Sequence, residues 1–402
     1  MSATDELRTA LVGALPKRPF RVEFWDGSTL ESTNGAGPTF RVRSPLALGH
    51  LLRAPGELGL GRAYVTGQVE VDDIDAALEV IDGWSAPPLD ARSKARIVAG
   101  AVRAGALRRL PRAPSVELRP QGRRHSILRD RRAVRFHYDV SNDFFRLFLG
   151  DSMTYSCAIW SRGATDLEEA QRTKLELVCT KLGLKAGERV LDVGCGWGSF
   201  ALHAAREHGV HVTGITLSEP QAALARERAE AAGLADSIDI RVMDYRELAG
   251  ERFDAVASIG MVEHVGSVNI DAYARRLAAC LGPGGRLLNH GIARLRVGDP
   301  EAGPFTQRFI FPDGAPLHLS RVVAALEAAG FETQHVEGFR HDYARTLREW
   351  ARNLDARHDE AIALAGDERV RVWRVYLRGA RRGFETGFTS VYQVRAELSR
   401  PA

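Results

Sequence analysis

The chain has 402 residues, of which 45% are hydrophobic and 26% charged, a composition typical of a globular protein with about two or three domains. No run of about 18 apolar residues occurs, which excludes an integral membrane protein, and no secretory signal is visible at the N-terminus. The four cysteines show no CxxC spacing, so we expect no disulfide framework, no metal site and a cytoplasmic location.

Residues 1–85 have the pattern of a small α+β accessory domain. Residues 20–31 predict a hairpin that turns at Asp26 and Gly27, and residues 39–44 predict a further strand. Residues 44–84 then predict a helix, a glycine-rich loop and a second helix. No catalytic constellation stands out in this region.

Residues 86–135 form an Arg-rich segment that we expect to be a helical linker. From Arg92 to Arg135 there are fourteen Lys or Arg residues but two acids, Glu117 and Asp130. Residues 89–110 have the spacing of a basic amphipathic helix, which suits an anionic membrane surface. A solvated linker and a surface helix packed on a neighbouring domain are the alternatives. Because no aromatic residue precedes Phe136 in this block, lipid head groups are favoured over nucleic acid.

From residue 136 to residue 402, strands alternate with helices, which predicts a Rossmann-like, doubly wound α/β domain. Strands are expected at residues 189–194, 211–218, 238–244, 253–260 and 284–293. Helices are expected between them at residues 199–209, 219–234 and 270–281. In such a sheet, ligands bind at the carboxyl ends of the strands.

The strongest local signal is the segment LDVGCGWGS, where Gly194, Gly196 and Gly198 lie between a strand and a helix. Glycines at this position let backbone amides approach a ligand. Dinucleotide-binding loops are similar, but the second strand ends in TLS, without the acid that holds an NAD ribose. A later strand ends at Asp244 and Tyr245, where an acid and an aromatic ring could meet an adenine. These features favour S-adenosylmethionine over a dinucleotide.

Three further segments carry candidate functional side chains. Residues 136–160 combine aromatic and small polar residues, although a helix followed by a packed loop is an alternative. Residues 258–266 set Glu263 and His264 just after a strand end, where a buried carboxylate needs a partner and a helix-capping acid is the alternative. His290 ends the next strand, as a ligand-site residue or as a satisfied structural histidine.

Taken together, these segments resemble the cyclopropane-fatty-acyl-phospholipid synthase family. The matching motifs occur in the family's order: FHYDVSNDFF, YSCAIW, LDVGCGWG, ITLSEPQ, DYRE, GMVEHVG, NHGIA, FIFPDG and HDYARTLREW. The N-terminal PGELGLGRAYVTGQVEVDDID is similar to the accessory domain of the longer, phospholipid-acting members. The resemblance covers nearly the whole chain and is weakest in the Arg-rich segment.

The resemblance implies a class I methyltransferase domain and two sets of site residues. S-adenosylmethionine would be surrounded by Tyr155, Ser156, Gly194, Gly196, Thr216, Gln221, Tyr245 and Arg246. A bicarbonate ion would be held by Cys157, Glu263, His290, Tyr343 and the backbone of Ile292. His137 would lie near the same catalytic site. A small packing residue is the alternative for Cys157.

The implied reaction transfers a methyl group to the cis double bond of a phospholipid acyl chain. An alkene is a weak nucleophile, so the sulfonium methyl must be held in line with it in a dry cavity. The resulting carbocation would be deprotonated by bound bicarbonate, which Glu263 and His290 orient while Tyr343 donates a hydrogen bond, and a cyclopropane ring would form. We expect peripheral attachment to the inner membrane face, no nucleic-acid partner and, as in relatives, a possible homodimer.

Alternative functions stay open at this point. The family includes enzymes that form a methylene-branched chain (10-methylene stearoyl, a tuberculostearic acid precursor) from the same double bond. Two positions depart from the family pattern, with Val262 where Phe is common and Tyr392 where many relatives carry Trp, and both could reshape the acyl tunnel. A catalytically inactive lipid-binding protein and an ordinary small-molecule methyltransferase are the remaining alternatives.

Overall fold

The computed structural model describes residues 3–108, 111–119, 121–138, 140–300 and 302–399, which form two compact units. Unit 1 comprises Met1–Glu117, Gly303–Phe309 and Gly366–Gly379, and unit 2 comprises Leu118–Ala302, Ile310–Ala365 and Ala380–Ala402. The units therefore interleave along the chain, whereas the sequence pattern predicts boundaries at residues 85 and 135. Among the described residues, no helix is both long enough and apolar enough to cross a bilayer.

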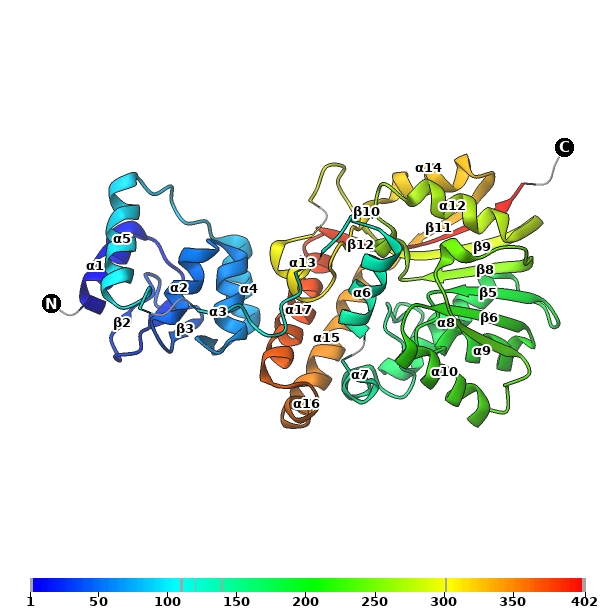
Figure 1. Ribbon diagram of the computed structural model, residues 1–402, viewed down its shortest axis with the longest axis horizontal. Coiled ribbons are helices and arrows are strands. Elements are labelled where there is room, and N and C mark those ends of the chain that lie inside the picture. The colour runs from blue at the N-terminus through cyan, green and yellow to red at the C-terminus, as the bar shows by residue number, and fades with distance from the viewer. Residues whose placement is uncertain (1–2, 109–110, 120, 139, 301, 400–402) are drawn as a thin grey trace. The chain divides into compact units, whose positions relative to one another are not determined.

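Unit 1 contains a four-stranded sheet with helices (Figure 1). Its elements are α1 (Ala3–Ala14), β1 (Arg21–Glu23), β2 (Thr29–Leu30), β3 (Thr39–Val42), α2 (Leu46–Arg53), α3 (Glu57–Val65), β4 (Val69–Val71), α4 (Ile74–Gly83), α5 (Ala91–Arg103), α13 (Pro304–Phe309) and the first part of α17 (Asp367–Glu385). The strand order is β2-β1-β3-β4. The predicted hairpin is present, because Val22 pairs antiparallel with Leu30.

The glycine-rich loop predicted before α4 is wrong, because its residues form helix α3 followed by strand β4. The glycines of α3 serve close packing. A Cβ added to Gly59 would clash with the carbonyl oxygen of Ala54, and one added to Gly61 would clash with the ring of Phe305. Glycine lowers helix propensity, so the sequence pattern favours a loop here, but the tertiary contacts determine the helix.

The helix predicted at residues 89–110 ends seven residues early, at Arg103 of α5. Its apolar side packs on α1, where Gly100 lies against Leu7 and Ala101 is buried. The helix therefore belongs to unit 1, as a surface helix rather than a free linker. Its cations Arg92, Lys94 and Arg96 are exposed, and Arg109 lies outside the described residues.

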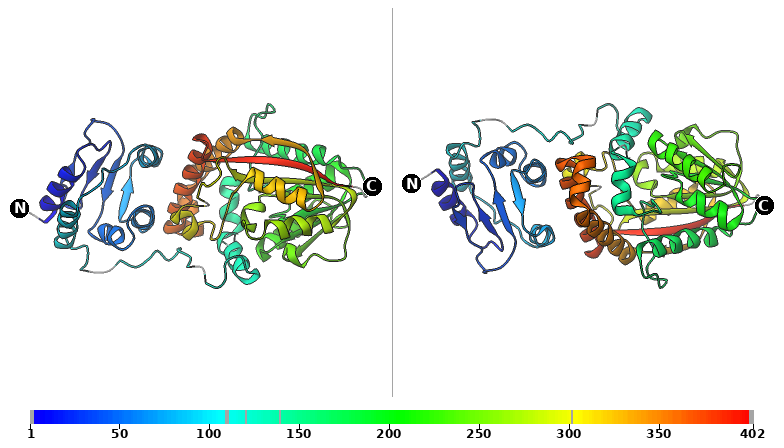
Figure 2. Two further views of the ribbon diagram at one scale, coloured as in Figure 1. Left: turned by 90° about the horizontal axis from the view of Figure 1, so that it is seen from above. Right: turned by 90° about the horizontal axis from the view of Figure 1, so that it is seen from below.

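Unit 2 contains an eight-stranded sheet covered by helices (Figures 1 and 2). Its strands are β5 (Arg189–Val193), β6 (His211–Thr216), β7 (Ile238–Val242), β8 (Phe253–Ile259), β9 (Leu281–Arg294), β10 (Leu317–His318), β11 (Phe331–Gly338) and β12 (Thr389–Leu398). Its helices are α6 (Ile127–Tyr138), α7 (Asn142–Leu149), α8 (Leu167–Leu182), α9 (Ser199–His208), α10 (Glu219–Ala231), η1 (Tyr245–Glu247), α11 (Val262–Val265), α12 (Ile270–Ala279), α14 (Leu319–Ala328), α15 (Arg340–Ala356) and α16 (His358–Ala365).

The strand order β11-β12-β9-β8-β5-β6-β7 confirms the predicted doubly wound fold. The strands from β9 to β7 are parallel, whereas β12 runs antiparallel to both β9 and β11. All five predicted strands and the three predicted helices are present. From β5 the chain runs outward to β6 and β7 and then crosses back to β8 on the other side of β5, so the topological switch lies at the carboxyl ends of β5 and β8.

The sheet core has two apolar faces, as alternation along its strands requires. Leu191 and Leu287 pack with α12 and α14 on one face. Val190 and Leu288 pack with α8, α9 and α10 on the other. Because helices cover both faces, a ligand can reach the sheet at the ends of its strands.

Candidate active site

The glycine loop after β5 has the backbone conformation that its sequence predicts. Gly194, Gly196 and Gly198 have φ values of +82°, +54° and +79°, in the region that disfavours side chains. The amides of Gly194 and Cys195 donate to the carbonyl of Ile215 at 3.0 and 2.9 Å, which ties the loop to β6. The loop is thus held open at the switch point, where α9 begins.

One pocket opens at this loop, and its lining includes all eight residues predicted to surround the cofactor. They are Tyr155, Ser156, Gly194, Gly196, Thr216, Gln221, Tyr245 and Arg246. Helix α6 adds Asp130, Val134 and Tyr138 to the lining, and the segment around α11 adds Met261, His264 and Val265. These residues therefore converge from six separate parts of the chain on one cavity.

At the end of β6, where a dinucleotide site has an acid for the ribose, this chain has Thr216 and Gln221. Thr216 Oγ1 donates to Gln221 Oε1 at 2.8 Å, and both side chains are buried. Ser218 caps α10 by accepting from the Gln221 amide at 3.4 Å. A hydroxyl and an amide, both held in place, thus occupy the position where a dinucleotide site has a carboxylate.

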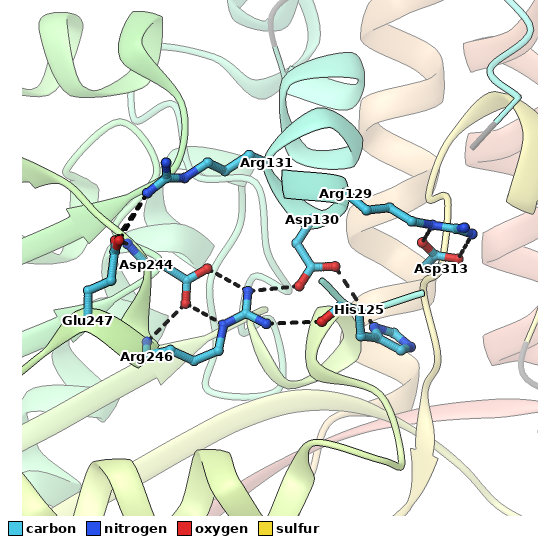
Figure 3. Close-up of polar contacts among 8 residues, drawn as sticks. All are labelled: His125, Arg129, Asp130, Arg131, Asp244, Arg246, Glu247 and Asp313. Carbon is cyan, nitrogen blue, oxygen red and sulfur yellow. Dashed lines mark hydrogen bonds and ion pairs between the residues drawn. The ribbon is translucent and has the colours of Figure 1, made fainter. Parts of the chain in front are cut away.

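Asp244 and Arg246 form an ion-pair network with α6 (Figure 3). Arg246 donates to both carboxylate oxygens of Asp244, at 2.7 and 2.6 Å, and to Asp130 at 2.9 Å. Burial raises the pKa of Asp130, and the charge of Arg246 opposes this rise. The guanidinium of Arg246 therefore faces two carboxylates, while Tyr245 contributes the aromatic ring at this end of the pocket.

Two more ion pairs hold α6 over the pocket (Figure 3). Arg129 binds Asp313 through two bonds of 2.5 and 2.7 Å, and Arg131 lies 3.1 Å from Glu247. Arg129 and Arg131 of the basic segment are therefore paired within unit 2, which the composition alone does not reveal. The exposed cations that remain on this stretch include Arg123, Arg132 and Arg135.

A buried lysine in the pocket is absent from the sequence prediction. Lys174 of α8 is 1% exposed and donates to Ser156 Oγ at 3.0 Å. Burial lowers its pKa and raises that of Asp192, whose Oδ2 has no hydrogen-bond partner among the described residues. One feature of the sequence could have identified this residue: Lys174 lies on the apolar face of α8, beside Leu175 and Val178. A charge in that position needs a buried partner.

Glu263 lies on α11, directly after the end of β8. Its Oε1 accepts from the backbone amide of Ile292 at 2.7 Å, and its Oε2 is buried without a hydrogen-bond partner among the described residues. Burial raises the pKa of Glu263 to about 7. The carboxylate is therefore a partner of β9 and not a helix cap, and one oxygen is left to bind something else.

His290 lies in β9, two residues before Ile292, and is 2% exposed. Lys181 donates to Gln393 Oε1 at 2.7 Å, so the amide nitrogen of Gln393 donates to His290 Nδ1 at 3.1 Å. The proton of the neutral ring must then be on Nε2, which has no hydrogen-bond partner among the described residues. Burial lowers the pKa of His290 to about 3, so the ring is a neutral donor.

The other predicted catalytic residues, Cys157, Tyr343 and His137, are not part of this pocket lining. Cys157 Sγ lies 3.3 Å from the carbonyl of Ala158 and 3.8 Å from that of Phe339, and burial raises its pKa well above the usual value. Tyr343 is buried and donates its amide to the same Phe339 carbonyl at 3.0 Å. His137 Nδ1 lies 3.0 Å from the carbonyl of Ile310.

These contacts group the candidate residues in a simple way. Cys157 Sγ and the backbone amide of Tyr343 contact the same carbonyl, and Glu263 binds β9 two residues after His290. The ring of His137 lies 5.6 Å from that of Tyr155. Cys157 is a neutral thiol bound to backbone carbonyls, so its chemistry is that of a weak donor.

The strand order, the glycine loop and the pocket at the switch point are those of a class I S-adenosylmethionine-dependent methyltransferase. The solved structure of mycolic acid cyclopropane synthase CmaA1, complexed with SAH and CTAB, superposes with a TM-score of 0.63 at 34% identity. That similarity covers 66% of this chain and 98% of the other.

The profile of the Mycolic acid cyclopropane synthetase family matches residues 125–394. A probable fatty acid methyltransferase of Mycobacterium tuberculosis is 40% identical over 96% of this chain and 93% of its own length. The cyclopropane-fatty-acyl-phospholipid synthase of Escherichia coli is 34% identical over 90% of this chain and 88% of its own length. The chain belongs to the cyclopropane synthase family and is an S-adenosylmethionine-dependent methyltransferase.

Proposed function

We propose that the enzyme transfers the methyl group of S-adenosylmethionine to the cis double bond of an unsaturated phospholipid acyl chain and closes a cyclopropane ring. Family membership supports the methyl transfer to a lipid. The phospholipid is supported by the similarity to the Escherichia coli synthase, which covers 90% of this chain and therefore extends into unit 1. The observation that carries the proposal is the pair of buried, unsatisfied atoms at β9, Glu263 Oε2 and His290 Nε2.

These two atoms fit a bicarbonate ion. Buried polar groups in proteins normally have partners, so an unsatisfied acceptor on α11, bound to the Ile292 amide of β9, and an unsatisfied donor two residues earlier in β9 indicate a ligand. Glu263 Oε2 is suited to accept the O–H of bicarbonate, and His290 Nε2–H to donate to an anionic oxygen. When bound, bicarbonate supplies a small base for the proton that the methylated chain must lose. The Ile292 amide donates to Glu263, so its contribution is to orient that carboxylate.

The remaining residues keep water and stronger nucleophiles away from a carbocation. Cys157 stays protonated because burial raises its pKa, and His290 stays neutral and presents N–H instead of a lone pair. The pocket side of α6 is closed by the Asp130, Arg246 and Asp244 network. A dry site that holds methyl donor and alkene in line is what this weak nucleophile needs.

The basic segment supports attachment to an anionic membrane. The exposed cations include Arg92, Lys94 and Arg96 in unit 1 and Arg123, Arg132 and Arg135 in unit 2. Each basic residue near an anionic surface contributes about 1 kcal/mol. The enzyme would thereby reach acyl chains at the inner membrane face.

The test is to incubate the full chain with S-adenosylmethionine, bicarbonate and vesicles of dioleoyl phospholipid, and then to analyse the acyl chains. Mass spectrometry should show the gain of one CH₂, and proton NMR should show the upfield signals of a cyclopropane ring. Vinylidene signals would assign the methylene-branched product instead. Turnover of a small soluble nucleophile without vesicles, or tight cofactor binding without lipid turnover, would contradict the proposal.

A further inference from the structure

Four metal-ligating side chains meet on α8 and α9, outside the pocket. Cys179 Sγ and the ligating nitrogens of His203 and His208 all lie within 4.8 Å of one another. Glu176, one turn before Cys179 on α8, has an oxygen 3.1 Å from Nε2 of both histidines. Nothing in the methyl-transfer chemistry uses these residues.

We propose that Cys179, His203, His208 and Glu176 form a structural zinc site that joins α8 to α9. Thiolate, imidazole and carboxylate are the ligands that Zn²⁺ takes in proteins, and four of them complete its usual tetrahedral shell. This differs from the expectation of no metal, which rests on the absence of CxxC spacing. The ligands here are spaced three residues apart on one helix and five apart on the next.

The distances are compatible with a metal at the centre of the group. Two ligand atoms at Zn–N or Zn–O distances of about 2.0–2.1 Å and a tetrahedral angle lie about 3.3 Å apart. The separation of 3.1 Å between the Glu176 oxygen and each Nε2 needs to open by about 0.2 Å. The thiol, at up to 4.8 Å, must approach by about 1 Å, which a cysteine rotamer adjustment supplies.

The burial of the four groups also suits a metal. Cys179 is fully buried on the core side, whereas the side chains of His203, His208 and Glu176 are 15%, 20% and 49% exposed, which leaves an entry path. Zinc binds cysteine as the thiolate, whereas an ordinary metal-free cysteine carries a thiol proton at neutral pH. Zinc binding would release that proton to solvent, and the thiolate and carboxylate charges would balance the ion.

A metal-free alternative exists and makes a different prediction. Glu176 could simply accept hydrogen bonds from both histidines and hold the two helices together without an ion. In that case Cys179 is an ordinary core residue, packed in the apolar face that α8 and α9 share. The thiol therefore distinguishes the two accounts.

The experiment uses the untagged full chain, stripped with a chelator and titrated with Co²⁺ as a spectroscopic substitute for Zn²⁺. We expect one equivalent to bind, with visible bands of tetrahedral cobalt and a near-ultraviolet thiolate-to-cobalt charge-transfer band. Zn²⁺ should displace the cobalt and raise the melting temperature, whereas Mg²⁺, a hard cation, should do neither. Calorimetry in buffers of different ionisation enthalpy should show the release of about one proton.

Variants assign the ligands. Cys179→Ser should lose the charge-transfer band and weaken Zn²⁺ binding at least tenfold, and His208→Gln should also weaken binding. Cys280→Ser is the matched control, because Cys280 is also buried, at 4% exposed, but lies in the opposite core. Unchanged SAH affinity shows that each variant is folded. The proposal is overturned if the stripped wild type binds no stoichiometric Co²⁺, or if Cys179→Ser binds it with an unchanged spectrum.

Discussion

Glu263→Gln is the substitution that tests the proposed mechanism most directly. The change keeps the size of the side chain and leaves one oxygen to accept from the Ile292 amide at 2.7 Å. It replaces the second oxygen, which has no partner among the described residues, with an amide NH₂. If Glu263 Oε2 accepts the O–H of bicarbonate, the variant places its amide N–H, a donor, against the O–H donor of the ion.

The expected loss of turnover follows from that one contact. A hydrogen bond to a charged group contributes about 1.5–3 kcal/mol, which corresponds to a factor of about 10 to 150. The repulsion between the amide N–H of the variant and the O–H of bicarbonate adds to this loss, so we expect turnover to fall by about 10² or more. SAH affinity should stay nearly the same, because Glu263 does not line the cofactor pocket.

The same substitution has a pH signature in stability. The pKa of Glu263 is about 7 in the folded chain against an ordinary value of 4.5, so the folded state binds the proton more tightly. Wild-type stability therefore falls as pH rises from 4.5 to 7, by about 3 kcal/mol in total. Gln has no charge to bury, so the free energy of unfolding of the variant should gain about 3 kcal/mol on that of the wild type between pH 4.5 and pH 8.

Three measurements decide the matter. Turnover on oleoyl phospholipid vesicles is compared with and without bicarbonate, SAH binding is measured by calorimetry, and urea unfolding is followed at both pH values without bicarbonate. Partial rescue of the variant by added bicarbonate would place ion and side chain in one step. Near-wild-type turnover of Glu263→Gln in bicarbonate-depleted buffer would refute the mechanism.

Three further predictions concern the cofactor pocket and the membrane. Gly196→Val should abolish SAH binding in calorimetry, because a branched side chain at φ +54° strains the loop and enters the pocket. Gly187→Val is the control: its φ is +82° with open space around it, and this variant should bind SAH normally. Lys174→Met removes a charge that opposes the effect of burial on Asp192, so the free energy of unfolding in urea should fall by about 1–3 kcal/mol. The added change Asp192→Asn should restore most of this loss, and equal losses in both variants would show that the two side chains are not coupled. Arg108→Gln with Arg123→Gln should weaken co-sedimentation with anionic vesicles, as should raising salt from 0.1 to 1 M, which shortens the Debye length from about 10 to 3 Å. As a control, Arg172→Gln with Arg206→Gln removes the same charge from two other exposed positions and should have little effect on co-sedimentation. Equal weakening by the two pairs of substitutions would indicate that the basic segment is an ordinary solvated surface.

The sheet and the pocket lining could be predicted from sequence because their signals are local. Each parallel strand is a short apolar run that ends in a glycine or a polar residue, and those strand ends meet at one edge of the sheet. Once the switch point is known, Thr216, Asp244 and Glu263 must lie near it. The glycine loop adds a backbone conformation that other residues adopt with strain.

The contacts that hold α6 could not be predicted, because they join residues far apart in the sequence. Asp130 and Arg246 are separated by 116 residues, and Arg129 and Asp313 by 184. No local pattern tells which arginine of a basic segment will find a carboxylate. Helix α3 could not be predicted for a related reason. The close neighbours that leave no room for a side chain at Gly59 come together only in the folded chain.

The two departures from the family pattern, Val262 and Tyr392, meet at one residue of β9. Val262 is buried in the core, and a Cβ added to Gly291 would clash with its side chain. Tyr392 is the cross-strand partner of Gly291 in β12. Gly291 lies next to His290, and Val262 precedes Glu263. Both departures therefore act on the segment that holds the proposed bicarbonate ligands.

This placement makes Val262→Phe a test of how that segment is positioned. The larger ring would press on Gly291 and displace the two unsatisfied atoms, Glu263 Oε2 and His290 Nε2, so kcat should fall about tenfold or more while SAH affinity is kept. Overpacking a core costs about 1–3 kcal/mol of stability wherever it occurs, so Val322→Phe, in the same core but on α14, is the control. NMR of the lipid product follows any shift between ring and methylene signals. If both variants lower stability and kcat equally, Val262 acts only through general packing and not through the positions of Glu263 and His290.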